Sequence, residues 1–168
     1  MYRLFLQLIF LASITLNAQY NEIKTAKITF DFPYKEVKGS IGGFTSTSTI
    51  DWNQPSESTL RGSVSVETLD TNNGIRNWSL RSGRYFNAKE YPTIIFESEE
   101  IKPNGGGWDV LGHLTIKGTK KEFQIHFTKM GNTLKGKGEL YSSDFGVTIK
   151  KKREDNLVIV NFEFELGS

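Results

Sequence analysis

The chain of 168 residues contains no cysteine. Disulfide crosslinks, thiol catalysis and cysteine-ligated metal sites are therefore excluded. A charge excess of one sign is also missing, because 21 basic and 19 acidic residues leave a net charge of +2, which gives no electrostatic case for nucleic-acid binding. No apolar run reaches the ~20 residues that a membrane-spanning helix needs. Length and composition instead suit one globular domain whose core is large enough to be stable by itself.

Catalytic signatures are also scarce. The chain has no G-x-S-x-G elbow, and no pair of carboxylates stands out from ordinary surface Asp and Glu. Its two histidines, His113 and His126, fall on the polar side of their strands, without acidic or imidazole partners spaced for a metal. We therefore expect no metal, no cofactor and no enzymatic activity, and an enzyme acting on lipid is the least supported hypothesis.

The N-terminus differs from the rest of the chain. Arg3 precedes a mostly apolar run over residues 4–16, and the small residue Ala18 follows it. This layout is typical of a secretory signal peptide, so we expect residues 1–18 to be cleaved and residues 19–168 to form the domain. The alternative is a buried N-terminal helix. The signal peptide predicts a periplasmic or secreted bacterial protein, and the lack of a cysteine after the run excludes a lipoprotein anchor.

Apolar and polar residues alternate along most of the remaining chain, which is typical of β-strands. In "KITFDF", residues 27–32, three apolar residues alternate with three polar ones. One apolar face and one polar face indicate an antiparallel sheet that is exposed on one side. The expected strands are eight: residues 27–32, 37–52, 58–69, 93–101, 108–117, 122–130, 133–141 and 156–166.

This pattern predicts an all-β fold, an eight-stranded antiparallel up-and-down barrel with a short helix inserted between strands 3 and 4. Short glycine-rich connections favour sequential antiparallel neighbours, and Gly42 with Gly43 indicates a corner where the second strand bends. Four more glycines fall on the apolar face: Gly62, Gly112, Gly136 and Gly138. Either they leave the barrel hollow, or they only permit strand curvature.

Residues 69–98, "LDTNNGIRNWSLRSGRYFNAKEYPTIIFES", interrupt the strand pattern. A helix over residues 74–82 is expected here, with Asn72 or Asn73 as its N-cap and Gly83 as its stop. At ~100° per residue, Ile75 and Trp78 share one side of this helix. We expect that side to cover the barrel mouth. The opposite side carries Arg76, Asn77, Leu80 and Arg81, which we expect to face solvent or a ligand headgroup.

The same thirty residues resemble the YceI-like family of secreted, polyisoprenoid-binding bacterial proteins, whose signature combines an arginine-bearing helix with "LrS", "yF" and "yP.i.F.S" elements. Further matches are "VKGSIGGF", "WDVLGHLTIKGTKKE" and "SSDFGV", so the resemblance covers residues 24–166. The chain departs from the family where Asn77 and Ser79 replace an acidic residue and a histidine. Thr25 and Ala26 also stand where an N-terminal "HS" is common.

The resemblance implies a lipocalin-like barrel that holds a polyisoprenoid or similar long-chain lipid, such as a prenyl quinone or prenyl phosphate, and that belongs to the transport and stress-response proteins. A filled barrel that acts through its outer surface and loops is the alternative. The expected apolar lining comprises Phe30, Phe44, Val64, Val66, Ile75, Trp78, Ile94, Phe96, Val110, Leu114, Phe123, Ile125 and Phe162. The expected headgroup contacts are Arg76, Arg81 and Arg84. We further expect a homodimer and a transient contact with a membrane surface. The charge run "KKKRED", residues 150–155, has two interpretations: it is a solvated hairpin tip, or it attracts anionic lipid headgroups.

Overall fold

The computed structural model describes residues 21–167, so the expected signal peptide lies outside the described residues. One antiparallel sheet of nine strands accounts for most of the fold, in the order β2-β1-β9-β8-β7-β6-β5-β4-β3. The strands are β1 (Glu22–Phe32), β2 (Val37–Ile41), β3 (Thr45–Ser46), β4 (Arg61–Ser65), β5 (Thr93–Pro103), β6 (Gly107–Ile116), β7 (Thr119–Met130), β8 (Thr133–Tyr141) and β9 (Leu157–Gly167).

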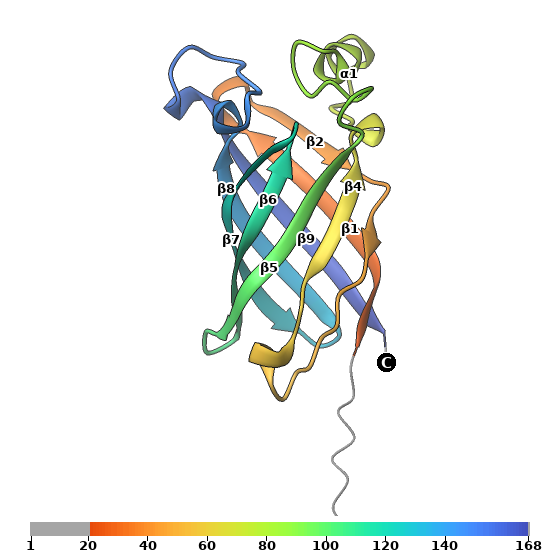
Figure 1. The fold of residues 1–168 in the computed structure, drawn as a ribbon, viewed down its shortest axis with the longest axis vertical. Coiled ribbons are helices and arrows are strands. Elements are labelled where there is room, and N and C mark those ends of the chain that lie inside the picture. Colours follow the sequence, from red (N-terminus) through yellow and green to blue (C-terminus); the bar gives the residue numbers. More distant parts are fainter. Residues whose placement is uncertain (1–20, 168) are drawn as a thin grey trace, which may run out of the picture.

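The sheet is strongly curled, and its strands run obliquely around a common interior to form a half-barrel (Figure 1). The strands at the two ends of the sheet order, β2 and β3, are joined directly by residues 42–44. Backbone hydrogen bonds also link the two edges. Asn21 and Ile50 exchange bonds of 2.9 and 3.1 Å, and the Ser65 N–H donates to the Gly42 carbonyl at 2.9 Å. Few backbone groups are therefore left unpaired at these edges.

The strand count corrects the sequence-based expectation of eight. The expected second strand, residues 37–52, divides into β2 and β3 at the glycine corner. Gly43 has a φ of +63°, a left-handed conformation that ends the ladder there. The expected third strand, residues 58–69, is shortened as well, because its C-terminal part forms the 3-10 turn η3 (Val66–Thr68). The all-β antiparallel character and the single helix are as predicted.

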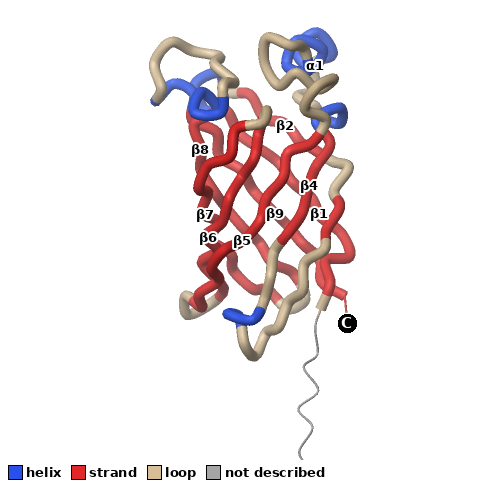
Figure 2. Tube along the Cα trace, viewed as in Figure 1, coloured by secondary structure: helices blue, strands red, loops and turns tan. Residues whose placement is uncertain are grey.

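The helical segments lie at the two ends of the barrel (Figure 2). Helix α1 (Gly74–Arg81) lies at one end together with η1 (Pro33–Lys35), η4 (Ser142–Phe145) and η5 (Glu154–Asn156), while η2 (Pro55–Glu57) lies at the other. Asn73 caps α1, and its side chain accepts a hydrogen bond from the Arg76 N–H at 2.9 Å, as the sequence predicts. Within residues 21–167, no helix is long and apolar enough to cross a membrane.

The end of the barrel that carries η2 is filled by side chains. Trp52 and Trp108 pack there with ring centroids 4.7 Å apart. Ile50, Val110 and Leu134 are completely buried in the same core. This end is therefore a solid floor, and any interior space must open toward α1.

Candidate ligand cavity

Above the floor, the barrel encloses a cavity of about 700 Å³. Its wall is mostly apolar and is formed chiefly by side chains from the inner face of the curled sheet, with polar residues such as Lys35, Arg76 and Ser142 among them. The volume falls within the ~300–1,000 Å³ range of pockets that bind small molecules. At the ~30 Å³ that one water occupies in the liquid, it has room for about twenty small heavy atoms. The centre of the barrel is not solid.

Most of the expected lining residues lie on the wall of this cavity. They are Phe30, Phe44, Val64, Ile75, Ile94, Phe96, Leu114, Phe123, Ile125 and Phe162. Strand parity places those that lie on strands correctly, because alternate residues of a strand point to opposite faces of a sheet; Phe44 lies between β2 and β3, and Ile75 lies on α1. Their contact with a ligand stays a prediction.

Three expected lining residues lie elsewhere. Val110 is 0% exposed and belongs to the floor, where its neighbours leave no free space. Val66 is 1% exposed in η3, past the end of β4, so the strand alternation no longer applies to it. Trp78 is 74% exposed and points away from the cavity.

The glycines of the apolar face act differently from what the sequence suggested. A Cβ on Gly136 would strike the ring of Phe127, and one on Gly138 would strike the ring of Phe123. The ring of Phe96 covers Gly112 and that of Phe44 covers Gly62 in the same way. Each glycine therefore lets an aromatic ring lie flat against the wall. The four rings line the cavity, whereas of the four glycines only Gly62 borders it.

Helix α1 contacts the barrel with the side that was expected to face outward. Asn77 is buried, and its Oδ1 accepts hydrogen bonds from the Thr71 N–H at 2.9 Å and from Thr71 Oγ1 at 2.6 Å. Its Nδ2 donates to Asp70 Oδ1 at 2.8 Å. The pKa of the Asp70 carboxyl is held below its ordinary value, first by this bond and then by a bond from the Asn72 backbone. Polar anchors, rather than apolar contact, thus orient the helix.

The three arginines expected at a headgroup differ in their environment. Arg81 Nη2 donates to the Leu69 carbonyl at 2.8 Å, so this side chain fastens α1 to the chain before it. Arg84 lies 5.5 Å above the ring of Tyr85 and does not border the cavity. Arg76 does border it, while its Nε and Nη2 donate to Thr71 Oγ1 and the Thr71 carbonyl. Of the three, only Arg76 has a place at the cavity.

The sequence reasoning missed two polar groups at the mouth. Lys35 extends from η1 to the rim. Ser142, at the start of η4, borders the cavity and is 5% exposed, yet its Oγ has no hydrogen-bond partner among the described residues. A buried hydroxyl without a partner is costly, and a polar ligand atom would satisfy it. The "SSDFGV" motif signalled Ser142, whereas nothing marked Lys35.

The two histidines lie on the outer surface. His113 Nδ1 is 3.2 Å from Glu99 Oε1, and His126 Nδ1 is 2.7 Å from Asp109 Oδ1. Hydrogen bonds from Asn104 and then from His126 hold the pKa of Asp109 below its ordinary value. Across residues 21–167, no group of three or more acidic or imidazole side chains gathers to hold a metal ion.

These features define a class of protein, an antiparallel barrel-like binding protein with an apolar cavity open at one end. Residues 15–166 match the model of the YceI-like domain, and the chain belongs to this family. The resemblance noted in the sequence is thereby confirmed.

Similar proteins agree with this assignment. A UPF0312 protein of Pseudomonas aeruginosa is 31% identical over 124 residues, which cover 68% of this chain and 65% of the relative. A UPF0312 protein of Photorhabdus laumondii is 32% identical over 134 residues, which cover 80% of this chain and 67% of the relative. The chain thus spans about two thirds of the length of these curated relatives.

Solved structures share the fold. The crystal structure of Burkholderia cenocepacia BcnA superposes with a TM-score of 0.72 at 21% identity, over 85% of this chain and 96% of that chain. A Campylobacter jejuni YCEI protein gives 0.65 at 19% identity, over 79% and 85%. A polyisoprenoid binding domain from Saccharophagus degradans gives 0.54 at 10% identity, over 90% and 98%. At these identities, the likeness shows the fold alone.

Proposed function

We propose that this protein is a periplasmic or secreted, non-catalytic carrier that holds a polyisoprenoid or similar long-chain lipid in its barrel. The single observation that carries the proposal is the apolar cavity of about 700 Å³, closed at the floor and open beside α1. Membership of the YceI-like family supports a lipid-binding role, as does the fold shared with a polyisoprenoid binding domain.

The cavity favours one orientation of the lipid. Its inner part is lined by phenylalanine and branched aliphatic side chains, which suit a hydrocarbon tail. Lys35, Arg76 and the Ser142 hydroxyl all border it at the α1 end. Each buried CH₂ contributes ~0.8 kcal/mol, so the tail supplies most of the affinity. A prenyl phosphate or prenyl quinone would leave its polar head at the mouth.

A filled barrel that acts only through its loops is the less favoured function. That hypothesis requires a packed centre, which the cavity contradicts. A larger residue at Gly138 does not separate the two hypotheses, because any Cβ there collides with the Phe123 ring and lies 2.8 Å from the Gln124 carbonyl oxygen. A substitution inside the cavity is a sharper test.

Neighbouring residues of β5 provide that test, because Ile94 lines the cavity and Ile95 is 38% exposed on the outside. Purified protein would be extracted with organic solvent and its lipids identified by mass spectrometry, and binding of added prenyl alcohol would be titrated. We expect Ile94→Trp to narrow the cavity and weaken the binding of a prenyl chain, because the larger ring takes space that the tail would use. Ile95→Trp should bind as the parent does.

Thermal unfolding monitored by circular dichroism would show that both variants fold. Protein that contains no co-purified lipid and ignores added prenyl lipids would refute the proposal. Equal binding by a folded Ile94→Trp variant would also refute it, because the lipid would then lie outside the barrel.

A further inference from the structure

The surface around the cavity mouth combines exposed apolar and basic side chains, and the proposed function does not use it. Five large hydrophobic residues are exposed among residues 21–167, and three of them, Tyr34, Ile75 and Trp78, lie at this end. Their exposed fractions are 51%, 83% and 74%. Ile75 and Trp78 lie one turn apart on α1, so they form one apolar strip.

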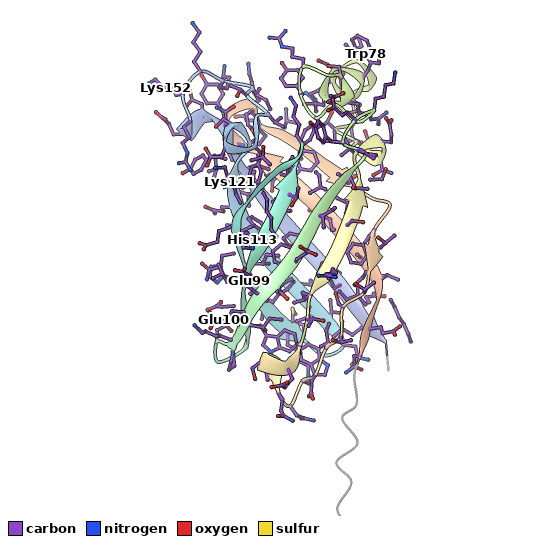
Figure 3. The ribbon with its side chains drawn as sticks, in the orientation of Figure 1. Trp78, Glu99, Glu100, His113, Lys121 and Lys152 are labelled. Atoms are coloured by element: carbon purple, nitrogen blue, oxygen red, sulfur yellow. The ribbon has the colours of Figure 1, made fainter. Side chains whose placement is uncertain are left out.

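A basic loop lies at the same end of the barrel, on the other side of the cavity opening from this strip (Figure 3). Lys150, Lys151 and Lys152 precede η5, and Lys150 Nζ lies 4.2 Å above the ring of Tyr34. Lys151 and Lys152 are exposed and make no ion pair within the described part of the chain. Arg153 is already engaged, because it donates two hydrogen bonds to Asp144.

The strip and the basic loop face the same way. Lys35, Ile75 and Ile149 all border the cavity, and they adjoin Tyr34, Trp78 and Lys150 respectively. Figure 3 shows Trp78 and Lys152 at the same end of the barrel, whereas Glu99 and Glu100 lie toward the other end. This end of the barrel therefore carries a set of lysine and large apolar side chains around the opening (Figure 3), defined here as the mouth patch: Tyr34, Lys35, Ile75, Trp78, Lys150, Lys151 and Lys152.

We propose that the mouth patch docks the barrel, opening first, on the surface of a bilayer that contains anionic lipid. Trp and Tyr favour the boundary between headgroups and acyl chains, and lysines beside them are attracted by anionic headgroups. Glu154 and Asp155 follow the three lysines and Arg153, so basic residues outnumber acidic ones in this loop. In this orientation, the apolar cavity opens toward hydrocarbon instead of water.

A second copy of the chain is a poorer occupant of the mouth patch. A two-fold interface would gather both copies of a patch with a net basic charge into one interface, and like charges brought together are unfavourable. The bilayer satisfies both halves of the patch at once. The docking proposal rests on the proposed function, since a lipid carrier must contact a membrane to exchange its lipid. The test of docking, however, uses protein without bound lipid.

The experiment measures binding of the delipidated full chain to two kinds of vesicle, phosphatidylcholine alone and phosphatidylcholine mixed with phosphatidylglycerol. Cosedimentation gives the partition coefficient, and brominated lipids report Trp78 by fluorescence quenching. We expect stronger binding to the anionic vesicles, weakened by salt. Lys151→Gln with Lys152→Gln should lower it about 25-fold, at about fivefold for each lysine. Ile75→Ser with Trp78→Ser should lower it about tenfold.

Matched controls remove the same groups elsewhere. Lys27→Gln with Lys135→Gln neutralises two exposed lysines of β1 and β8, and Ile95→Ser with Met130→Ser removes the two exposed apolar residues outside the mouth patch. Both should bind vesicles as the parent does. Mouth-patch variants that bind as well as these controls would overturn the proposal. Self-association without vesicles that disappears in the Ile75→Ser, Trp78→Ser variant would assign the patch to a second copy and overturn it too.

Failure of docking and failure of lipid binding give different results. A protein that binds vesicles through the mouth patch but never takes up a prenyl lipid would refute the carrier function and leave docking supported. A protein that takes up prenyl alcohol from solution but ignores anionic vesicles would refute docking alone.

Discussion

Asn77 Oδ1 lies 2.6 Å from Thr71 Oγ1 and 2.9 Å from the Thr71 backbone nitrogen, and this pair decides which side of α1 faces the barrel. The amide is buried, while Trp78, its neighbour in sequence, is 74% exposed. Turning Asn77 outward would leave the Thr71 N–H and hydroxyl without this partner, at a cost of about 1–3 kcal/mol for each buried group left unsatisfied. With the helix held in this way, Ile75 borders the cavity, whereas Trp78 does not.

The anchor role of Asn77 predicts a specific loss of stability. Asn77→Ala leaves the Thr71 N–H, the Thr71 hydroxyl and the Asp70 carboxylate without this partner, which should cost about 1–3 kcal/mol. Urea denaturation measures the free energy of unfolding, and hydrogen exchange should show the loss within residues 71–81. Trp78→Ala is the control and should stay within about 0.5 kcal/mol of the parent. Equal effects of the two substitutions would contradict the anchor role.

The same anchor should weaken in acid. The pKa of Asp70 is held below its ordinary value by hydrogen bonds from Asn77 and Asn72. A depressed folded-state pKa contributes stability that is present above the unfolded pKa and is lost as the pH falls through the folded one. Hydrogen exchange in α1, corrected for its intrinsic pH dependence, should therefore accelerate below the ordinary range of aspartate. In Asp70→Asn, this acceleration should vanish; if it persists, another carboxylate is responsible.

The glycine–phenylalanine contacts predict that replacing one of these glycines by alanine destabilises the fold. In Gly136→Ala, the new Cβ would lie 2.6 Å from Phe127 Cδ1 and would push the ring toward the cavity. Overpacking of this kind costs about 1–3 kcal/mol, and the displaced ring should also reduce lipid uptake. Gly106→Ala is a matched control, because nothing lies within 4 Å of its Cβ. Unfolding free energies of the two variants should differ accordingly, and equal values would mean that the ring simply moves aside.

The cavity volume predicts a limit on the length of the bound chain. About twenty small heavy atoms fit at ~30 Å³ each, which corresponds to about four isoprene units. Affinity for prenyl alcohols should rise with each added unit up to about twenty carbons and then level off, since further units extend beyond the mouth. Competition titrations with alcohols of increasing length would measure this. A continued rise beyond that length would indicate that the cavity expands.

Lys35 should distinguish prenyl phosphates from prenyl alcohols. An exposed ion pair is worth up to about 1 kcal/mol, so Lys35→Gln should weaken the binding of a prenyl phosphate by up to about fivefold and leave the corresponding alcohol unchanged. Lys38→Gln, on the exposed side of β2, is the control for net charge. Parallel titrations of both lipids would show whether the phosphate lies at the mouth. An equal loss for the alcohol would place Lys35 against the tail.

The strands and most of the cavity wall could be predicted because strand alternation is local. The side chains of Phe30, Phe96 and Phe162 point inward for the same reason that their neighbours point outward. Val110 shows the limit of this reasoning, since it has the correct face but lies in the floor. Alternation identifies the side of a strand, whereas the height along the barrel depends on registers such as Val110 opposite Ile101 and Ile125.

The helix and the glycines could not be predicted in the same way. The sequence predicted that Ile75 and Trp78 both face the mouth, and only Ile75 borders the cavity, because the sequence does not reveal that Asn77 would meet Thr71 and Asp70. For the glycines, the sequence left open whether they make a hollow or permit strand curvature, because it does not reveal that Phe127 and Phe123 would lie over Gly136 and Gly138. Both outcomes depend on side-chain contacts that form only in the folded protein, and strand alternation does not predict such contacts.

The sequence by itself determined the all-β class, the capped helix and the apolar face of each strand, since these follow from backbone preferences and from the period of two along a strand. Only the tertiary structure decided that one end of the barrel is packed solid, that the other end stays open and that Trp78 of α1 lies exposed outside the cavity. The physical reason is that strand register, ring stacking over glycine and buried hydrogen bonds are settled between segments that are distant in the chain.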